Sequence, residues 1–298
     1  MTFDRSPVPV FRFAPSPNGL LHAGHAFSAH LNFEAARGLE GRFLLRMEDI
    51  DQIRCTSDLE AQMVEDLQWL GLSWEMPVLR QSERFDVYRQ ALKKLDELGV
   101  LYRGYLSRGD IRKFVADFEV DGAVWPRDPD GAPIYPGDAR VLSAQELEKR
   151  RAGDGPYSLR LNMKAALELI EDRQPLSWWE GKSECLTPES WLEGTRIVAD
   201  PSVWGDVVLA RKDTPTSYHL SVVVDDAAQG VSDVIRGKDL EPATSVHRLL
   251  QELLGLPEPR YRHHRLLLDE DGEKLSKSRA SLSLKALREA GTSVDQLY

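Results

Sequence analysis

The chain has 298 residues, 42% hydrophobic and 29% charged, and its net charge of −10 argues against indiscriminate polyanion binding without excluding a local basic groove. Its two cysteines, Cys55 and Cys185, exclude a disulfide scaffold or a cysteine-rich metal cluster, and a chain of this length can bury a core without either. The N-terminus lacks the features of a signal peptide and no apolar run is long enough to span a bilayer, which predicts a cytoplasmic protein without membrane contact.

The first 100 residues predict a parallel sheet with crossover helices, because strand and helix patterns alternate. Residues 8–14 have the composition of a strand and end in a Pro-Ser-Pro-Asn-Gly turn, and residues 43–47 form a second apolar run. Helices are expected over residues 24–37, 57–70 and 84–98. We expect three glycines to end these helices and one capping box to start the second, namely Gly38, Gly71, Gly99 and the pair Ser57 and Glu60.

The middle of the chain, residues 101–195, predicts an inserted α+β subdomain. Turn residues crowd this stretch, and only a helical patch at 144–151 and an alternating strand at 157–163 interrupt them. The predicted organisation is therefore a catalytic domain in two halves, residues 1–100 and 196–298, separated by the insert.

Strand and helix patterns resume in the second half. One helix is expected over residues 244–254, ended by Gly255. Strands or strand ends are expected at residues 207–211, 221–226, 233–237 and 263–269. This second set of strands predicts an α/β fold for the whole catalytic part.

The sequence lacks the GxxxxGK[ST], GxGxxG, GxSxG and HExxH patterns, which argues against a P-loop ATPase, a dinucleotide dehydrogenase, an α/β-hydrolase and a zincin. It does contain His22 and His25, three apart where a helix is expected to start. A helix N-terminus suits phosphate, and Gly24 leaves room for a nucleotide near the backbone. Two surface histidines after a turn are the alternative, and the strand and Pro-rich turn before them favour the functional interpretation.

A second candidate motif follows Asp271 and Gly272. Lys274 and Lys277 stand three apart with serines between and after them, in the order Lys-Leu-Ser-Lys-Ser. A cationic loop of this kind can close on a triphosphate and stabilise the charge of departing pyrophosphate. A solvated basic loop is the alternative, and the presence of both motifs in this order argues against coincidence.

Together these motifs resemble the HIGH and KMSKS motifs of the class I aminoacyl-tRNA synthetases. The segments Arg12–Gly19, Leu45–Asp49 and Val234–Gly237 are similar to the glutamate-specific branch of that family. The resemblance covers residues 8 to about 100 and 196–280 and implies a Rossmann-like catalytic domain with a parallel sheet and an inserted subdomain. Because the chain stops 20 residues after Ser278, no anticodon-binding domain is expected.

This short length resembles the short paralogues of the branch, which activate L-glutamate without tRNA and attach it to the queuosine base at the wobble position of tRNA(Asp). The resemblance implies a ligase that uses ATP with Mg²⁺ and takes L-glutamate and queuosine-containing tRNA(Asp) as partners. It also implies a monomer. Two alternatives are a truncated glutamyl-tRNA synthetase that charges the 3′ end of tRNA(Glu) and a tRNA-binding paralogue without activity. An unrelated HxGH nucleotidyltransferase is a third.

The resemblance also assigns the site residues. Arg12 and Arg236 are expected to hold the two carboxylates of glutamate, Glu48 its ammonium group, and Tyr218 to donate its hydroxyl. The full predicted glutamate site is Arg12, Phe13, Ala14, Pro15, Ser16, Glu48, Tyr218 and Arg236. The predicted ATP site is His22, Gly24, His25 and Lys277, and the catalytic set is His22, His25, Lys274 and Lys277.

Other polar residues have a structural alternative. A structural ion pair at a strand end is the alternative interpretation of Glu48 and Arg236. Asp225 and Asp226 are expected at a strand end, with a structural or tRNA-side role rather than a metal site.

Members of this family often carry a zinc site in the insert, and here the sequence departs from them. The positions that align with its cysteines hold Gly104, Leu106 and Ala139, and only Tyr135 is retained. A tetrahedral site needs about four ligands, so no zinc or other protein-bound metal is expected. We expect the insert to be held by packing around Tyr105, Trp125 and Ile134.

Overall fold

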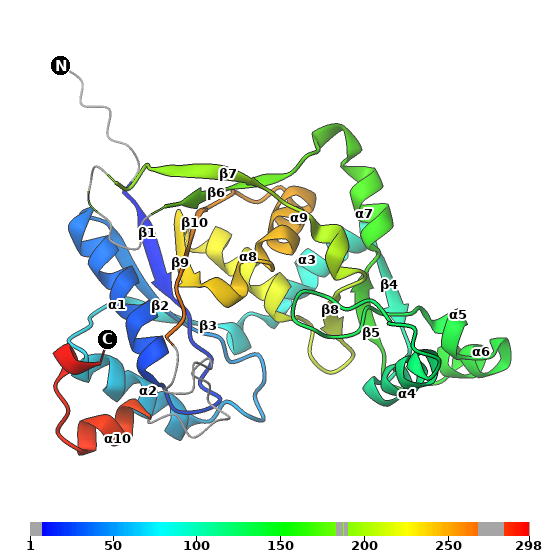
Figure 1. Ribbon diagram of the computed structural model, residues 1–298, viewed down its shortest axis with the longest axis horizontal. Coiled ribbons are helices and arrows are strands. Elements are labelled where there is room, and N and C mark those ends of the chain that lie inside the picture. The colour runs from blue at the N-terminus through cyan, green and yellow to red at the C-terminus, as the bar shows by residue number, and fades with distance from the viewer. Residues whose placement is uncertain (1–7, 183–186, 188–189, 268–282, 298) are drawn as a thin grey trace.

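Two sheets form the centre of the larger end of the molecule (Figure 1). In the first, β1 (Val10–Phe13), β2 (Arg42–Met47) and β3 (Glu75–Arg80) pair in parallel. In the second, β6, β10 and β9 pair in parallel and β7 is an antiparallel edge strand. The bounds of this second set are Ser177–Gly181 for β6, Gly194–Val198 for β7, Asp233–Gly237 for β9 and Arg260–His264 for β10. This computed structural model describes residues 8–182, 187, 190–267 and 283–297.

The two sheets lie side by side, and helices cover both faces. The backbone N–H of Ser232, just before β9, donates to the carbonyl of Val10 in β1 at 3.1 Å. Helices α1, α2 and α10 pack on one face, and α3, α8 and α9 pack on the other. Their bounds are Ala23–Gly38, Ser57–Trp69, Leu284–Glu289, Phe85–Glu97, Tyr218–Ala228 and Thr244–Leu254, in that order. The predicted α/β fold with a parallel sheet is confirmed.

Alternation along the strands decides which side chains face α8 and α9. Successive strand residues point to opposite faces of a sheet. Val10 and Leu44 belong to the core under α3, α8 and α9, whereas Phe11, Phe43 and Leu45 belong to the core under α1 and α2. Val234 in β9 and Tyr261 in β10 belong to the same core as Val10 and Leu44. The polar residues two or four positions after these four residues therefore point to the same side of the sheets, and they are Arg12, Arg46, Glu48, Arg236 and His263.

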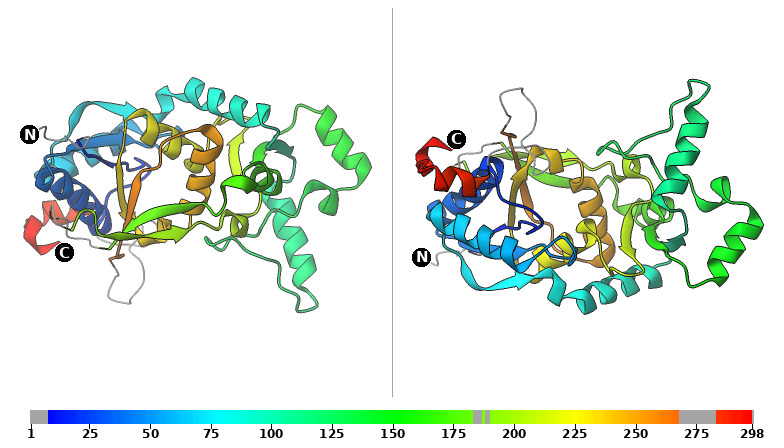
Figure 2. Two further views of the ribbon diagram at one scale, coloured as in Figure 1. Left: turned by 90° about the horizontal axis from the view of Figure 1, so that it is seen from above. Right: turned by 90° about the horizontal axis from the view of Figure 1, so that it is seen from below.

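The inserted unit lies at the far end of the molecule and has its own antiparallel sheet (Figure 2). That sheet orders β4 (Leu101–Gly104), β5 (Ser158–Leu161) and β8 (Val208–Arg211). The helices of this part are α4 (Arg108–Glu119), α5 (Asp138–Val141), α6 (Ala144–Ala152) and α7 (Met163–Leu169). The strands do not follow the predicted boundary at residue 195. Strand β6 precedes it but pairs in the large sheet, and β8 follows it but pairs in the small sheet.

Aromatic packing is prominent in the insert. The Trp125 ring meets Phe114 and Phe118 edge to face, with centroids 4.9 and 5.0 Å away. Its indole N–H donates to the carbonyl of Ile134 at 2.8 Å, and Tyr105 lies 6.4 Å from Tyr157. The residues expected to hold this unit thus lie in aromatic and hydrogen-bonded contact.

Several local predictions are wrong. Residues 221–226, expected as a strand, lie inside helix α8. Their three consecutive valines favour a strand by local propensity, but every residue from 220 to 226 is buried, so tertiary packing decides the conformation. Thr56 rather than Ser57 caps α2, and Gly38 is the last residue of α1 instead of its stop signal. Strand β3 was not predicted, because its first half is exposed and carries a proline.

The other helix ends agree with the prediction. Gly71, Gly99 and Gly255 follow α2, α3 and α9 with φ angles of 76°, 72° and 66°, the left-handed region that glycine tolerates best. Within the described ranges, every helix is too short or too polar to cross a membrane.

Candidate active site

A cavity of about 600 Å³ opens at the carboxyl ends of β1, β2, β9 and β10. In open parallel sheets, ligands bind at this edge, where loops from neighbouring strands diverge. Every predicted glutamate and ATP residue that the structure describes lines this cavity, namely Arg12, Phe13, Ala14, Pro15, Ser16, His22, Gly24, His25, Glu48, Tyr218 and Arg236. One cavity therefore gathers segments that are more than 200 residues apart in the chain.

Lys274 and Lys277 lie outside the described residues, so their predicted roles remain predictions. The described residues on either side of them are at the cavity. Leu267 lines it, and Ser283 forms a β-bridge with His22.

The two histidines of the first motif cap helix α1. The Nδ1 atom of His22 accepts from the backbone N–H of Gly24, and the Nδ1 atom of His25 accepts from that of His22, both at 3.2 Å. A neutral imidazole that accepts at Nδ1 carries its proton on Nε2. Both rings therefore present an Nε2 donor at the N-terminus of a 16-residue helix, which favours an anion.

Gly24 is needed for this arrangement. A Cβ at Gly24 would stand 3.0 Å from Cε1 and 3.1 Å from Nδ1 of the His22 ring, closer than side chains normally approach. The missing side chain thus makes room for the imidazole of His22, in addition to the nucleotide contact expected from the sequence.

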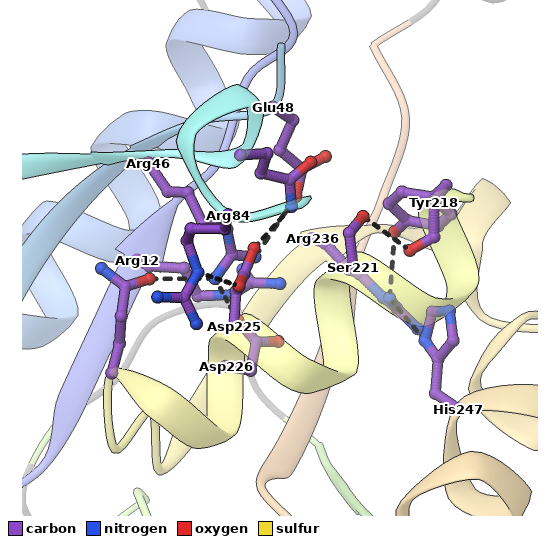
Figure 3. A network of polar contacts seen from close by, with 12 residues as sticks. Arg12, Arg46, Glu48, Arg84, Tyr218, Ser221, Asp225, Asp226, Arg236 and His247 are labelled. Carbon is purple, nitrogen blue, oxygen red and sulfur yellow. Dashed lines mark hydrogen bonds and ion pairs between the residues drawn. The ribbon is translucent and has the colours of Figure 1, made fainter. Parts of the chain in front are cut away.

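A buried network of charges joins β1, β2 and α8 beside the cavity, which two of its members, Arg12 and Glu48, line (Figure 3). Asp226 accepts from Arg12 Nε at 3.1 Å and from Arg46 Nη1 at 2.7 Å, and Arg46 Nη2 donates to Glu48 at 3.2 Å. Burial alone would raise the pKa of Asp226, but Arg12 and Arg46 lower it. Burial raises the pKa of Glu48 against the opposing effect of the same two arginines. The four formal charges cancel.

Arg12 keeps donors for a ligand in spite of this pairing. In the described part of the chain, Nε is the only side-chain nitrogen of Arg12 with a hydrogen bond, to Asp226. Arg12 is 4% exposed and lines the cavity, so its two Nη groups remain to bind a carboxylate. Asp226, which was expected at a strand end, holds this arginine from inside a helix.

Asp225 has a structural environment, as the sequence suggested. Its carboxylate accepts from Arg84 at 2.7 Å, from the Tyr88 hydroxyl at 2.7 Å and from the Gln81 amide at 2.9 Å. Burial, reinforced by Asp225, raises the pKa of Tyr88. These bonds join α8 to α3 and the turn before it.

Arg236, at the end of β9, donates all five of its N–H groups to uncharged acceptors. Nε donates to His263 Nε2 at 3.1 Å, and the two Nη1 hydrogens go to the Tyr218 hydroxyl at 3.3 Å and His247 Nδ1 at 3.2 Å. Nη2 donates to the Leu240 carbonyl at 3.1 Å and the Thr244 hydroxyl at 2.7 Å.

Arg236 is 5% exposed, and among the described residues no carboxylate lies within 4.0 Å of it. Glu48 does form an ion pair at the end of β2, with Arg46, as the structural alternative expected, whereas Arg236 forms none with the described residues. Burial lowers the pKa of His247 well below its ordinary value and that of His263 to about 4, so both rings are neutral at pH 7. Burial also raises the pKa of Tyr218, which keeps its hydroxyl protonated. Among the described residues the Arg236 guanidinium therefore has no direct ion-pair partner at this end of the cavity, which the Asp239 carboxylate also lines.

Ten further residues that were not among the predicted site residues also line the cavity. Ser28 lies one helical turn after His25, so helical spacing could have identified it. Phe27 also lies in α1, Ile235 and Gly237 lie in β9, and His264 ends β10, whereas the remaining residues stand in the turns that follow β1, β9 and β10. The ten residues are Asn18, Phe27, Ser28, Ile235, Gly237, Asp239, Leu240, His264, Leu266 and Leu267.

The positions that align with the zinc-binding cysteines of the family hold Gly104, Leu106 and Ala139, which cannot bind zinc through their side chains. A Cβ at Gly104 would stand 2.8 Å from the Tyr135 hydroxyl and 3.0 Å from Cδ of Arg160. That hydroxyl donates to Asp138 at 2.5 Å, and the Arg160 guanidinium lies 3.6 Å from the Tyr135 ring centroid. The residues in these positions do not fit zinc. Within the described ranges, His, Cys, Asp and Glu form no group of three or more that could hold a metal.

Comparison with known proteins matches this arrangement to one family. The model of the class I tRNA synthetases (E and Q), catalytic domain, matches residues 9–177 and 189–295. A Glutamyl-Q tRNA(Asp) synthetase of Rhodobacter capsulatus is 44% identical over 286 residues, 95% of this chain and 96% of the relative. One of the same name from Nocardia farcinica is 38% identical over 96% of this chain and 81% of the relative.

Longer proteins also match. A Glutamate–tRNA ligase of Aquifex aeolicus is 34% identical over 96% of this chain but only 55% of its own length. The crystal structure of a glutamate tRNA ligase from Elizabethkingia meningosepticum in complex with its amino acid has a TM-score of 0.67 at 26% identity. It covers 92% of this chain, which spans about half (52%) of that ligase. The chain therefore belongs to the class I tRNA synthetases (E and Q), and within them to the Glutamyl-Q tRNA(Asp) synthetases.

Proposed function

We propose that this protein activates L-glutamate with ATP without needing tRNA, and transfers the glutamyl group to the queuosine base of tRNA(Asp). In the first step, a carboxylate oxygen of glutamate attacks the α-phosphorus of ATP, and the bond to pyrophosphate breaks. The names of the most similar relatives support this reaction. The observation that carries it is the buried guanidinium of Arg236, which has only neutral partners among the described residues.

Glutamate has two carboxylates and one ammonium group, and the cavity offers a match for each. Arg236 supplies a positive charge for one carboxylate, and the Nη groups of Arg12 are available for the other. Glu48 lines the same cavity as the acidic group for the ammonium. Phe13, Ala14, Pro15 and Ser16 form the wall between these groups at the end of β1.

ATP is proposed to bind at the start of α1. The Nε2 donors of His22 and His25 and the helix N-terminus suit its phosphates, and Gly24 keeps the first ring in place. Mg²⁺ would arrive with ATP, held mostly by phosphates and water. Lys274 and Lys277 are proposed to stabilise the departing pyrophosphate, on the basis of the sequence motif alone.

Two assays test the proposal together. Glutamate-dependent exchange of pyrophosphate into ATP, without tRNA, measures the first step. Incubation with ATP, glutamate and queuosine-containing tRNA(Asp), followed by mass spectrometry of its nucleosides, measures the second. Glutamyl-queuosine is the expected product. Exchange that requires tRNA, or no modified nucleoside, would contradict the proposal.

The similarity to Glutamate–tRNA ligases favours one alternative, charging of the 3′ end of tRNA(Glu). The same incubation with tRNA(Glu) and tritiated glutamate separates the two. An alkali-labile ester on the 3′ end of tRNA(Glu), with nothing on tRNA(Asp), would favour this alternative. A paralogue without activity would give neither product and no exchange.

We also propose that the protein is a cytoplasmic monomer. Sedimentation would check the oligomeric state, and cell fractionation would check the localisation.

A further inference from the structure

A chain of hydrogen bonds runs behind Arg236 and ends at a carboxylate outside the cavity lining. Arg236 Nε donates to Nε2 of His263 on β10 at 3.1 Å. On the other side of that ring, Nδ1 lies 2.9 Å from Oε2 of Glu180 on β6. The chain thus crosses three neighbouring strands, β9, β10 and β6.

The partners fix which nitrogen of His263 carries the proton. Arginine only donates, so Nε2 must accept, and an ionised carboxylate only accepts, so Nδ1 must donate. Both contacts require the Nδ1-protonated form of a neutral ring. The side chain of His263 is 1% exposed, so no solvent contact competes with this form.

Glu180 is itself held in place. Its Oε1 accepts the backbone N–H of His263 at 2.8 Å, and its Oε2 also accepts the indole N–H of Trp178 at 2.9 Å. Hydrogen bonds from His263 and Trp178 lower the pKa of this carboxylate, although its burial opposes them. Glu180 therefore stays ionised and presents acceptors only.

Among the described residues, Glu180 is connected to Arg236 by hydrogen bonds only through the imidazole of His263. A carboxylate in direct contact would neutralise the guanidinium, and the site would lose its attraction for an anionic ligand. Placed behind a neutral ring, the same carboxylate makes His263 a stronger acceptor and holds the ring plane, while Arg236 keeps its charge toward the cavity.

We infer that Glu180 and His263 are positioning residues that orient the Arg236 guanidinium for the side-chain carboxylate of glutamate. The inference rests on the proposed function for the identity of the ligand. It predicts that Glu180 acts on glutamate binding only through the imidazole of His263. A merely structural role of Glu180 would not depend on that ring.

A double-mutant cycle tests this dependence. Glu180→Gln cannot accept all three donors, so we expect the KM for glutamate to rise roughly ten- to thirtyfold, with the KM for ATP unchanged. His263→Gln can still turn an amide oxygen to Arg236 without help from Glu180. In that background, Glu180→Gln should change the glutamate KM less than twofold.

Glu258→Gln is the matched control. Glu258 accepts from the backbone N–H of Trp179 in β6 and from the guanidinium of Arg196. It neither lines the cavity nor contacts His263. It should leave the glutamate KM unchanged. An equal rise of the KM from Glu180→Gln in both backgrounds, or no rise in either, would overturn the inference.

A readout without substrates keeps the inference separate from the proposed function. In protein labelled with ¹⁵N-histidine, His263, assigned with the His263→Gln variant, should show the Nδ1-protonated neutral form at pH 7. An Nε2-protonated ring would refute the hydrogen-bond chain from Glu180 through His263 to Arg236, even if glutamate is activated normally. Conversely, His263 could show the expected ring form while the unmodified protein shows no glutamate-dependent pyrophosphate exchange. That result would overturn the proposed function and, with it, the role of Glu180 and His263 in glutamate binding.

Discussion

Replacing Arg236 by alanine should abolish most of the affinity for glutamate while leaving ATP binding nearly intact. The guanidinium is 5% exposed, and all five of its N–H groups are directed by neutral acceptors. Without it, a glutamate carboxylate would be buried at this end of the cavity with no opposing charge. Truncating one partner of a buried, hydrogen-bonded charge pair costs about 2–5 kcal/mol, or about 30-fold to several thousand-fold in affinity.

The measurement is pyrophosphate exchange with glutamate titrated at saturating ATP, and then with ATP titrated at saturating glutamate. Arg260→Ala is the matched control, because Arg260 stands on the adjacent strand, pairs with Asp233 and does not line the cavity. We expect the glutamate KM to rise at least 30-fold only in the Arg236 variant.

Arg236→Lys separates charge from shape. Lysine keeps the charge but offers three donors in place of five, so at least two acceptors lose their partner. We expect an intermediate glutamate KM. A glutamate KM that is unchanged in Arg236→Ala would refute the assignment of this residue and the reasoning from its charge.

Three further predictions concern the nucleotide end, stability and metal. Gly24→Ala should raise the KM for ATP several-fold without lowering Tm, because its Cβ displaces the His22 ring while alanine favours the helix; ATP titration and thermal melting check this. Burial raises the pKa of Asp66 to about 6 from 3.8, so its charge destabilises the fold above pH 6 and has no effect below pH 4. Asp66→Asn should therefore stabilise the protein by up to about 3 kcal/mol at pH 8 and not at pH 4, and no difference in Tm at pH 8 would contradict this. Purified protein should contain no stoichiometric zinc and should keep its Tm and its exchange activity in a chelator, whereas one zinc per chain by elemental analysis would show that prediction wrong.

The local sequence was sufficient to locate those parts of the site that are built from neighbouring residues. The turn before α1 and the pair His22 and His25 could be located from the sequence, because a strand, a turn and a helix start follow each other directly. The same reasoning failed for the valines of α8, since the sequence does not reveal that packing surrounds that helix on all sides.

Contacts between elements that are distant in the chain could not be derived from local patterns. Arg46 meets Asp226 across 180 positions of the chain, and Glu180 meets His263 across 83. The first contact depends on the packing of α8 against β2, and the second depends on the pairing of β6 with β10; both follow from the whole topology. The hydrogen bond between Arg236 and His263, which joins two neighbouring strands, was therefore not predicted.

The charges around the cavity explain why the two predicted carboxylate-binding arginines are not equivalent. Arg12 shares Asp226 with Arg46, and with Glu48 this group of four sums to zero formal charge. Arg236 lies outside that group, and all of its direct hydrogen-bond partners in the described part of the chain are neutral. An amino acid whose ammonium and α-carboxylate bind at the balanced end adds no net charge there, because those two groups also cancel. In the proposed binding mode its side chain extends toward Arg236, where an anionic group would pair with the buried guanidinium.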